Sequence, residues 1–144
     1  KGLFICQQMF YAILSLRFHN EDPSRFDLNQ GMKELEREYS PYPHMKGTHF
    51  HLSFGHLEGY SAMYYTYAWS NVIAKDLFSR FQDAGIMNER VCRQYRDCIL
   101  APGGSQDAAD LVERFLGRPY SFQAFKNWVS SSSKESYFPS HRIL

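Results

Sequence analysis

The sequence lacks the features that define several common protein classes. Its three cysteines are an odd number without CxxC spacing, which argues against a disulfide framework or a zinc knuckle. Lys and Arg number 16 against 15 Asp and Glu, so no strong field attracts nucleic acid or an anionic membrane. No apolar run reaches the roughly 20 residues of a membrane helix, and Gln7, Gln8 and Arg17 interrupt the apolar amino end. Free thiols fit a reducing compartment, and we expect the cytoplasm.

Several catalytic motifs are also missing. The sequence contains no HExxH, no P-loop, no nucleophile elbow and no dinucleotide fingerprint. The glycines of APGGS, residues 101–105, lack the lysine and the strand of a phosphate cradle, so we interpret this segment as a helix terminator. By contrast, 44% of the 144 residues are hydrophobic and 17% are aromatic, which favours a folded globular chain over disorder.

Apolar residues recur at helical spacing along most of the chain. The expected helices cover residues 3–18, 28–39, about 60–82, 89–100, 106–116 and 122–129. Their expected N-caps are Asp27, Asn88, Ser105 and Ser121. Gly85 and Gly117 are typical helix stops, and only residues 49–54 alternate enough to form a short extended piece. The sequence therefore predicts an all-α fold, with the first helix largely buried.

Four tyrosines fall within eight positions of the stretch FGHLEGYSAMYYTYAWS, residues 54–70. On a continuous helix, Tyr60, Tyr64 and Tyr67 would share one face, whereas Tyr65 would point elsewhere. A phenol keeps its proton at neutral pH, so it can donate to a carbonyl oxygen or to the oxyanion formed when that carbonyl is attacked. The pattern is therefore compatible with binding of a peptide backbone.

Other interpretations of the same stretch remain open. Tyrosine is frequent in cores and interfaces, so the pattern alone favours packing of the phenols over substrate binding, and they are also compatible with the partner-binding surface of a stand-alone helical module. The histidines offer a further alternative. His49 and His51 would point to one side of an extended segment, with His44 or His56 as a third zinc ligand.

The order of the motifs resembles that of a known family. FGHLEGYSAMYYTYAWS is followed by FSRFQDAGIMN, YRDCILAPGGSQDAADLVERFLGR and FQAF. This order is similar to the carboxyl-terminal part of the thimet oligopeptidase family of zinc metallopeptidases, which includes neurolysin, oligopeptidase A, dipeptidyl carboxypeptidase and mitochondrial intermediate peptidase. The resemblance covers about residues 3–129 and implies a helical portion of a two-lobed, channel-forming zinc peptidase.

The resemblance also implies a role for the tyrosine stretch. In the family, the matching loop and helix lie opposite the zinc and contact the substrate backbone and the scissile carbonyl. Carried over, Tyr60 and Tyr67 are expected to donate hydrogen bonds to the tetrahedral intermediate or to the neighbouring carbonyl. The expected substrate-binding residues are Gly55, His56, Gly59 and Tyr64. Glu58 stands where most members have another glycine, which changes the expected reach of the loop.

The family's zinc is held by HExxH and a downstream glutamate, which this sequence does not contain. The resemblance thus implies zinc in the full-length enzyme, no zinc bound by this chain, and no activity of the chain alone. The expected partners are short peptides and the remainder of the same polypeptide, which would carry HExxH. Neither nucleic acid nor a membrane is expected as a partner.

The organisation of the chain follows from the same resemblance. Residues 1–129 are expected to form the C-terminal helical subdomain of the peptidase, and residues 130–144 a loose tail. Because the chain begins at Lys1 within an apolar segment, we expect it to belong to a longer enzyme and to expose an apolar face on residues 3–14. A mitochondrial matrix location is the alternative to the cytoplasm.

Overall fold

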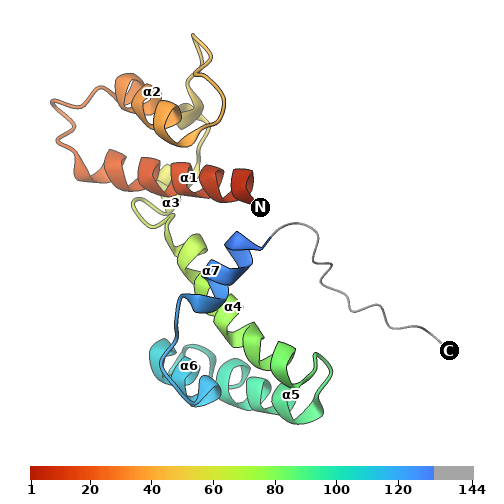
Figure 1. Ribbon diagram of the computed structural model, residues 1–144. Helices are drawn as coiled ribbons and strands as arrows, with labels where there is room; N and C mark the ends of the chain where they lie inside the picture. Colours follow the sequence, from red (N-terminus) through yellow and green to blue (C-terminus); the bar gives the residue numbers. More distant parts are fainter. Residues whose placement is uncertain (132–144) are drawn as a thin grey trace. The chain divides into compact units, whose positions relative to one another are not determined.

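The computed structural model describes residues 1–131 as helices joined by turns (Figure 1), with no strand in this part of the chain. The helices are α1 (Gly2–Asn20), α2 (Leu28–Tyr39), α3 (His56–Gly59), α4 (Thr66–Ala84), α5 (Glu89–Tyr95), α6 (Ala108–Leu116) and α7 (Gln123–Ser130). Short 3₁₀ segments lie at Phe50–Leu52 and Gly103–Ser105, and a π-helical turn at Arg96–Leu100. The predicted all-α fold is confirmed. Within residues 1–131, no helix combines the length and apolar character needed to span a membrane.

The chain divides into two compact units, Lys1–Trp69 and Ser70–Leu144. The boundary between them falls inside α4, which supplies its first residues to the first unit. Helix α7 ends at Ser130. Residues 132–144, which make up most of the predicted loose tail, lie outside the described residues.

The core of the first unit forms where α1 lies beside α2 (Figure 1). Its buried apolar side chains are Phe10, Ala12, Leu14, Met32, Leu35, Phe54 and Tyr64. Helix α1 is buried only in its middle, at Phe10, Ala12, Leu14 and Ser15, so the prediction that it is largely buried is wrong for the rest of the helix. In its first turns, Leu3 is 56% exposed and Phe4 is 51% exposed. These two side chains form an exposed apolar face at the start of the chain.

Helix α2 begins at the predicted N-cap. The Asp27 carboxylate accepts a hydrogen bond from the backbone N–H of Gln30 at 2.9 Å. The reciprocal half of a capping box is not formed, because the Gln30 side chain donates to Glu34 instead, at 3.0 Å. Local side-chain chemistry was sufficient to predict where this helix starts.

Two predicted elements between residues 49 and 82 are wrong. Residues 49–54 are not extended, because Phe50–Leu52 form a 3₁₀ turn. In this turn the backbone N–H of Leu52 donates a hydrogen bond to the His49 carbonyl at 3.0 Å. The helix predicted from residue 60 begins only at Thr66. Ser61 adopts a φ of 46°, in the left-handed region that an α-helix cannot contain, and this separates the turn after α3 from α4.

The remaining helix ends follow the predicted chemistry except at two predicted N-caps, Ser105 and Ser121. Ser121 does not cap α7, because that helix begins at Gln123 after Phe122, which occupies the N-cap position. Gly85 and Gly117 lie beyond α4 and α6 with φ values of 97° and 73°, as expected of helix-terminating glycines. Asn88 caps α5 by accepting from the N–H of Val91 at 3.2 Å. The N-cap of α6 is Asp107, not Ser105, because residues 103–105 form a 3₁₀ turn before that helix begins.

The second unit packs α4, α5 and α6 around a small apolar core. Its buried apolar side chains are Val72, Val91, Leu111, Val112 and Phe115. Phe115 is fully buried, and the rings of Phe81 and Tyr95 lie against it with centroids 5.9 Å and 5.5 Å away. Of the stripe predicted on the long helix, Phe81 thus reaches this core, whereas Trp69 is 43% exposed.

A buried carboxylate on α4 joins the segment after α6 to this core. Asp76 is 1% exposed, and its two carboxylate oxygens accept hydrogen bonds from the Arg118 guanidinium at 2.7 Å and 2.8 Å. The backbone N–H of Ser121 donates to the same carboxylate at 2.7 Å. These bonds lower the pKa of Asp76 below its usual value, with Arg118 as the main cause. Asp76 therefore fixes the chain that leads into α7.

We expect Asp76→Asn to lower the free energy of unfolding of the chain by about 2–3 kcal/mol near neutral pH, because the amide cannot accept all three bonds. The pKa of Asp76 is depressed on folding, so its contribution is present above the unfolded pKa of about 3.9 and is lost as the pH falls through the folded pKa. Urea denaturation at several pH values checks both points. The difference between wild type and Asp76→Asn should shrink toward pH 3, and exposed Asp83→Asn serves as the control. An equal effect of the two substitutions would contradict the assignment.

Candidate functional site

His56 lies at the centre of a ring cluster in the first unit. Its imidazole stacks on Tyr60 with centroids 5.5 Å apart and meets the rings of Tyr64 and Tyr67 edge-on, at 5.1 Å and 5.8 Å. The rings of Tyr64 and Tyr67 lie 4.9 Å apart. We call these four residues the His56 cluster. The structure therefore brings together the histidine and the three tyrosines that the sequence singled out.

The sequence analysis predicted that the tyrosines share one face of a continuous helix. This prediction is wrong, because the cluster is built from several short elements. His56 opens the short helix α3, and Tyr60 follows one turn later at the end of that helix, so the two rings stack. The left-handed residue Ser61 then redirects the chain. Tyr64 lies in the following turn, and Tyr67 lies in the first turn of α4. The tyrosines converge because the chain folds around His56.

The three phenols differ in their access to a ligand. Tyr60 is 55% exposed and Tyr67 is 46% exposed, whereas Tyr64 is buried. The Tyr67 hydroxyl lies 3.4 Å from Nε2 of His56, a long contact. The Tyr64 hydroxyl donates to Oε1 of Gln8 at 3.3 Å, and burial raises the pKa of Tyr64. The side chains of Tyr60 and Tyr67 are thus half-exposed, while Tyr64 uses its donor within the fold.

The two glycines of the loop lie beside the cluster. Gly55 directly precedes α3 and Gly59 closes it. A Cβ added at either position would meet no atom within 4 Å, so no neighbouring side chain requires glycine there. Close approach of a ligand stays the predicted reason for both glycines. Glu58 is exposed on the same short helix, and Tyr65 is exposed outside the His56 cluster.

The histidines considered as alternative zinc ligands do not converge on one site, although the rings of His49 and His51 meet edge-on with centroids 6.1 Å apart. His44 pairs with Glu36, and Nδ1 of His49 lies 2.7 Å from Oδ1 of Asn29. Nδ1 of His51 is buried without a hydrogen-bond partner, and burial, aided by His49, lowers the pKa of His51. Across residues 1–131, no three His, Cys, Asp or Glu side chains gather closely enough to hold a metal ion. The donor set of this part of the chain therefore does not fit a zinc site.

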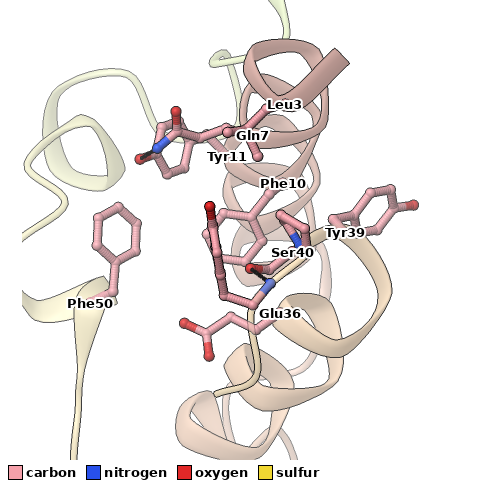
Figure 2. A pocket seen from close by; sticks show the side chains of 10 residues that line it. Leu3, Gln7, Phe10, Tyr11, Glu36, Tyr39, Ser40 and Phe50 are labelled. Atoms are coloured by element: carbon pink, nitrogen blue, oxygen red, sulfur yellow. Dashed lines mark hydrogen bonds between the residues drawn. The ribbon is translucent and has the colours of Figure 1, made fainter. Parts of the chain in front are cut away.

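A cavity of about 270 Å³ opens next to the core of the first unit (Figure 2). It is lined by Leu3, Gln7, Phe10, Tyr11, Glu36, Tyr39, Ser40, Pro41, Tyr42 and Phe50. Tyr11 connects this cavity with the His56 cluster, because its ring also meets Tyr64 edge-on at 5.5 Å. The sequence analysis did not find this cavity, since it forms only when the ends of α1 and α2 meet the loop before α3.

Comparison with known proteins decides the family. Residues 1–130 match the family model described as peptidase family M3. The chain belongs to peptidase family M3. It is 36% identical to oligopeptidase A of Escherichia coli strain K12 over 125 residues, which cover 81% of this chain and 18% of that protein. It is 32% identical to the thimet-like oligopeptidase of Dictyostelium discoideum over 126 residues, or 86% of this chain and 19% of that protein.

The match extends to mitochondrial enzymes. Human mitochondrial intermediate peptidase is 31% identical over 109 residues, which cover 76% of this chain and 15% of that protein. The chain thus spans less than a fifth of the length of these curated relatives. The resemblance to the thimet oligopeptidase family is confirmed, and with it the metalloprotease class to which the chain is related.

The packing of Tyr64 gives a direct test of the cluster. We expect Tyr64→Phe to lower the free energy of unfolding by about 1 kcal/mol, because only the hydrogen bond to Gln8 is lost. Tyr64→Ala should cost about 3–5 kcal/mol, because the ring also packs on Tyr11, Phe54 and His56. Denaturant titration of the chain measures both, with exposed Tyr65→Phe as the control. Equal costs for the two Tyr64 variants would contradict a packing role of the ring.

Proposed function

We propose that this chain is the substrate-binding portion of a zinc-dependent oligopeptidase that hydrolyses peptide bonds in short peptides. The observation that carries the proposal is the His56 cluster, in which the half-exposed side chains of Tyr60 and Tyr67 lie beside an imidazole. Membership of peptidase family M3 supports a peptide as the ligand of this cluster. A row of neutral donors on an exposed surface suits the carbonyl oxygens of a peptide backbone.

Each residue of the cluster has its own part in this proposal. Tyr60 and Tyr67 donate hydrogen bonds to the scissile carbonyl oxygen and to the oxyanion that it becomes, which lowers the barrier more than it strengthens binding of the substrate. His56 contacts the peptide and orients Tyr67 through its Nε2 atom. Tyr64 supports Tyr67 with its ring, since its own hydroxyl is held by Gln8. Gly55 and Gly59 keep the approach to the peptide free of side chains.

The metal belongs elsewhere in this proposal. Zinc, when bound in the family's HExxH site, activates water and polarises the substrate carbonyl. Since residues 1–131 gather no metal-ligand set, we assign no step through zinc to this chain. The partner of the chain is then the remainder of the same polypeptide, carrying HExxH, together with the peptide substrate. We propose the cytoplasm as the location, with the mitochondrial matrix as the alternative, which the likeness to human mitochondrial intermediate peptidase supports.

A second candidate function is a stand-alone helical module that binds a protein or peptide without chemistry. The observation in its favour is the exposure of Tyr60 and Tyr67, together with the exposed apolar side chains of Leu3 and Phe4 at the start of α1. The two functions differ in what the phenols do. In the module, loss of a hydroxyl would weaken binding, whereas in the peptidase it would slow the reaction of bound substrate.

We expect Tyr60→Phe and Tyr67→Phe in the full-length peptidase each to lower kcat about a hundredfold, or about 3 kcal/mol in the transition state, with little change in KM. Steady-state hydrolysis of a quenched fluorescent peptide measures both constants. Tyr65→Phe makes the same chemical change outside the His56 cluster and should retain activity. A rise in KM at constant kcat would show that the phenols bind the substrate without stabilising the transition state, and would contradict the proposed role.

We expect the 144-residue chain alone to bind short peptides and to cleave none of them, with or without added zinc. A peptide titration followed by NMR should shift the side-chain signals of His56, Tyr60 and Tyr67, while the exposed ring of Tyr42 serves as a reference within the chain. Mass spectrometry of the same samples detects any cleavage. Chelator-sensitive hydrolysis by the purified chain would sink the proposal that its activity needs the rest of the polypeptide.

A further inference from the structure

Helix α1 carries polar side chains on the face that meets the tyrosine stretch. Gln8, Tyr11 and Ser15 are spaced i, i+3 and i+7, so they share one side of the helix. The Gln8 side chain accepts a hydrogen bond from the Tyr64 hydroxyl, and the Tyr11 ring contacts the Tyr64 ring. Ser15 completes the stripe, because its hydroxyl donates to the backbone carbonyl of Ser61. Every member of this polar stripe thus contacts residues 61–64.

Ser15 is unusual within the core of the first unit. It is 0% exposed, and its neighbour Leu14 is equally buried. A hydroxyl in such a place destabilises the fold unless it is hydrogen-bonded, whereas alanine would occupy the site without needing a partner. The partner that Ser15 finds is a carbonyl 46 positions later in the chain. Because the buried hydroxyl of Ser15 needs this hydrogen bond, the fold is stable only when the partner carbonyl lies within reach of it.

Ser61 is the residue that needs such a constraint. Its φ of 46° makes it the one non-glycine residue with positive φ in the described part of the chain. The left-handed conformation is unfavourable for a residue with a Cβ atom, so the turn persists only where surrounding contacts hold it. Ser61 directly follows Tyr60, whose ring stacks on His56. A hydrogen bond that holds the Ser61 backbone therefore acts on the residue directly after Tyr60.

We propose that Ser15 is a positioning residue for the His56 cluster, which acts through the Ser61 carbonyl to hold Tyr60 against His56. The structural part of this inference concerns only the first unit. Its catalytic part rests on the proposed function, in which Tyr60 donates to the reacting carbonyl. Gln8 and Tyr11 hold the other end of the same segment through Tyr64.

The first experiment measures the position of Tyr60 in the 144-residue chain by NMR. Ser15→Ala is expected to weaken the nuclear Overhauser contacts between the ring protons of His56 and Tyr60 at least twofold. Contacts between Phe54 and Tyr64, whose centroids are 5.2 Å apart, should persist and report that the core is folded. Unchanged contacts between His56 and Tyr60 would overturn the inference.

Two further variants keep this result interpretable. Ser53→Ala removes a serine hydroxyl that bonds locally to the Phe50 carbonyl at 3.0 Å, and it should leave the contacts of His56 unchanged. If Ser15→Ala does not fold, Ser15→Cys keeps the shape of the side chain with a slightly larger atom and a weaker donor, and it is expected to weaken the same contacts partially. Full retention of the contacts in a folded Ser15→Cys chain would then overturn the inference.

The second experiment is a double-mutant cycle in the full-length peptidase. Ser15→Ala is expected to lower kcat about tenfold at unchanged KM, because a donor displaced by a fraction of an ångström no longer meets the oxyanion. In the Tyr60→Phe background, Ser15→Ala should have no further effect on kcat. An equal loss in both backgrounds would show general destabilisation and overturn the positioning role. If Tyr60→Phe itself leaves kcat unchanged, the proposed function fails, and the NMR result decides the structural part independently.

Discussion

The packing of Tyr64 against helix α1 is the contact on which the candidate site depends. The Tyr64 ring lies between Tyr11 and Phe54 on the core side and His56 and Tyr67 on the outer side. Aromatic pairs of this kind contribute through both buried area and ring geometry. Tyr64 is buried, whereas Tyr67, which its ring contacts, is half-exposed. The core therefore contacts the half-exposed Tyr67 ring directly through Tyr64. The site is an outward continuation of the core of the first unit.

The same logic recurs in the second unit with a different group. Ser15 and Asp76 are the buried polar side chains among residues 1–131, and each is hydrogen-bonded to a segment more than 40 positions away. A buried polar group tolerates few alternative arrangements, since an unpaired donor or acceptor is costly in an apolar setting. Ser15 fixes the turn after α3, and Asp76 fixes the approach to α7 through Arg118 and Ser121. Apolar burial stabilises both units, and the hydrogen bonds of Ser15 and Asp76 determine where the distant segments that they bind must lie.

Family membership and residue geometry answer different questions about this chain. The match to peptidase family M3 covers residues 1–130, so it defines the class of enzyme to which the segment is related. It does not explain why the side chains of Tyr60 and Tyr67 are half-exposed while the Tyr64 hydroxyl is hydrogen-bonded within the fold. That distinction arises because Tyr64 is buried and because the Gln8 side chain accepts the hydrogen bond that the Tyr64 hydroxyl donates. Chemically identical side chains in one short stretch thus acquire different capacities.

The sequence by itself determined the helical class, the family, the caps at Asp27 and Asn88, and the glycine stops, because these depend on local propensity and motif order. It also singled out the residues of the His56 cluster. Only the tertiary structure decided how they meet, because one left-handed residue, Ser61, replaces the expected helical register. The polar stripe of α1 was likewise invisible, since Gln8 interrupts an apolar pattern and gains its meaning only from a partner 56 positions away. The periodicity of a sequence predicts which face of a helix a residue occupies. Which distant segment packs on that face depends on long-range hydrogen bonds, which the periodicity does not contain.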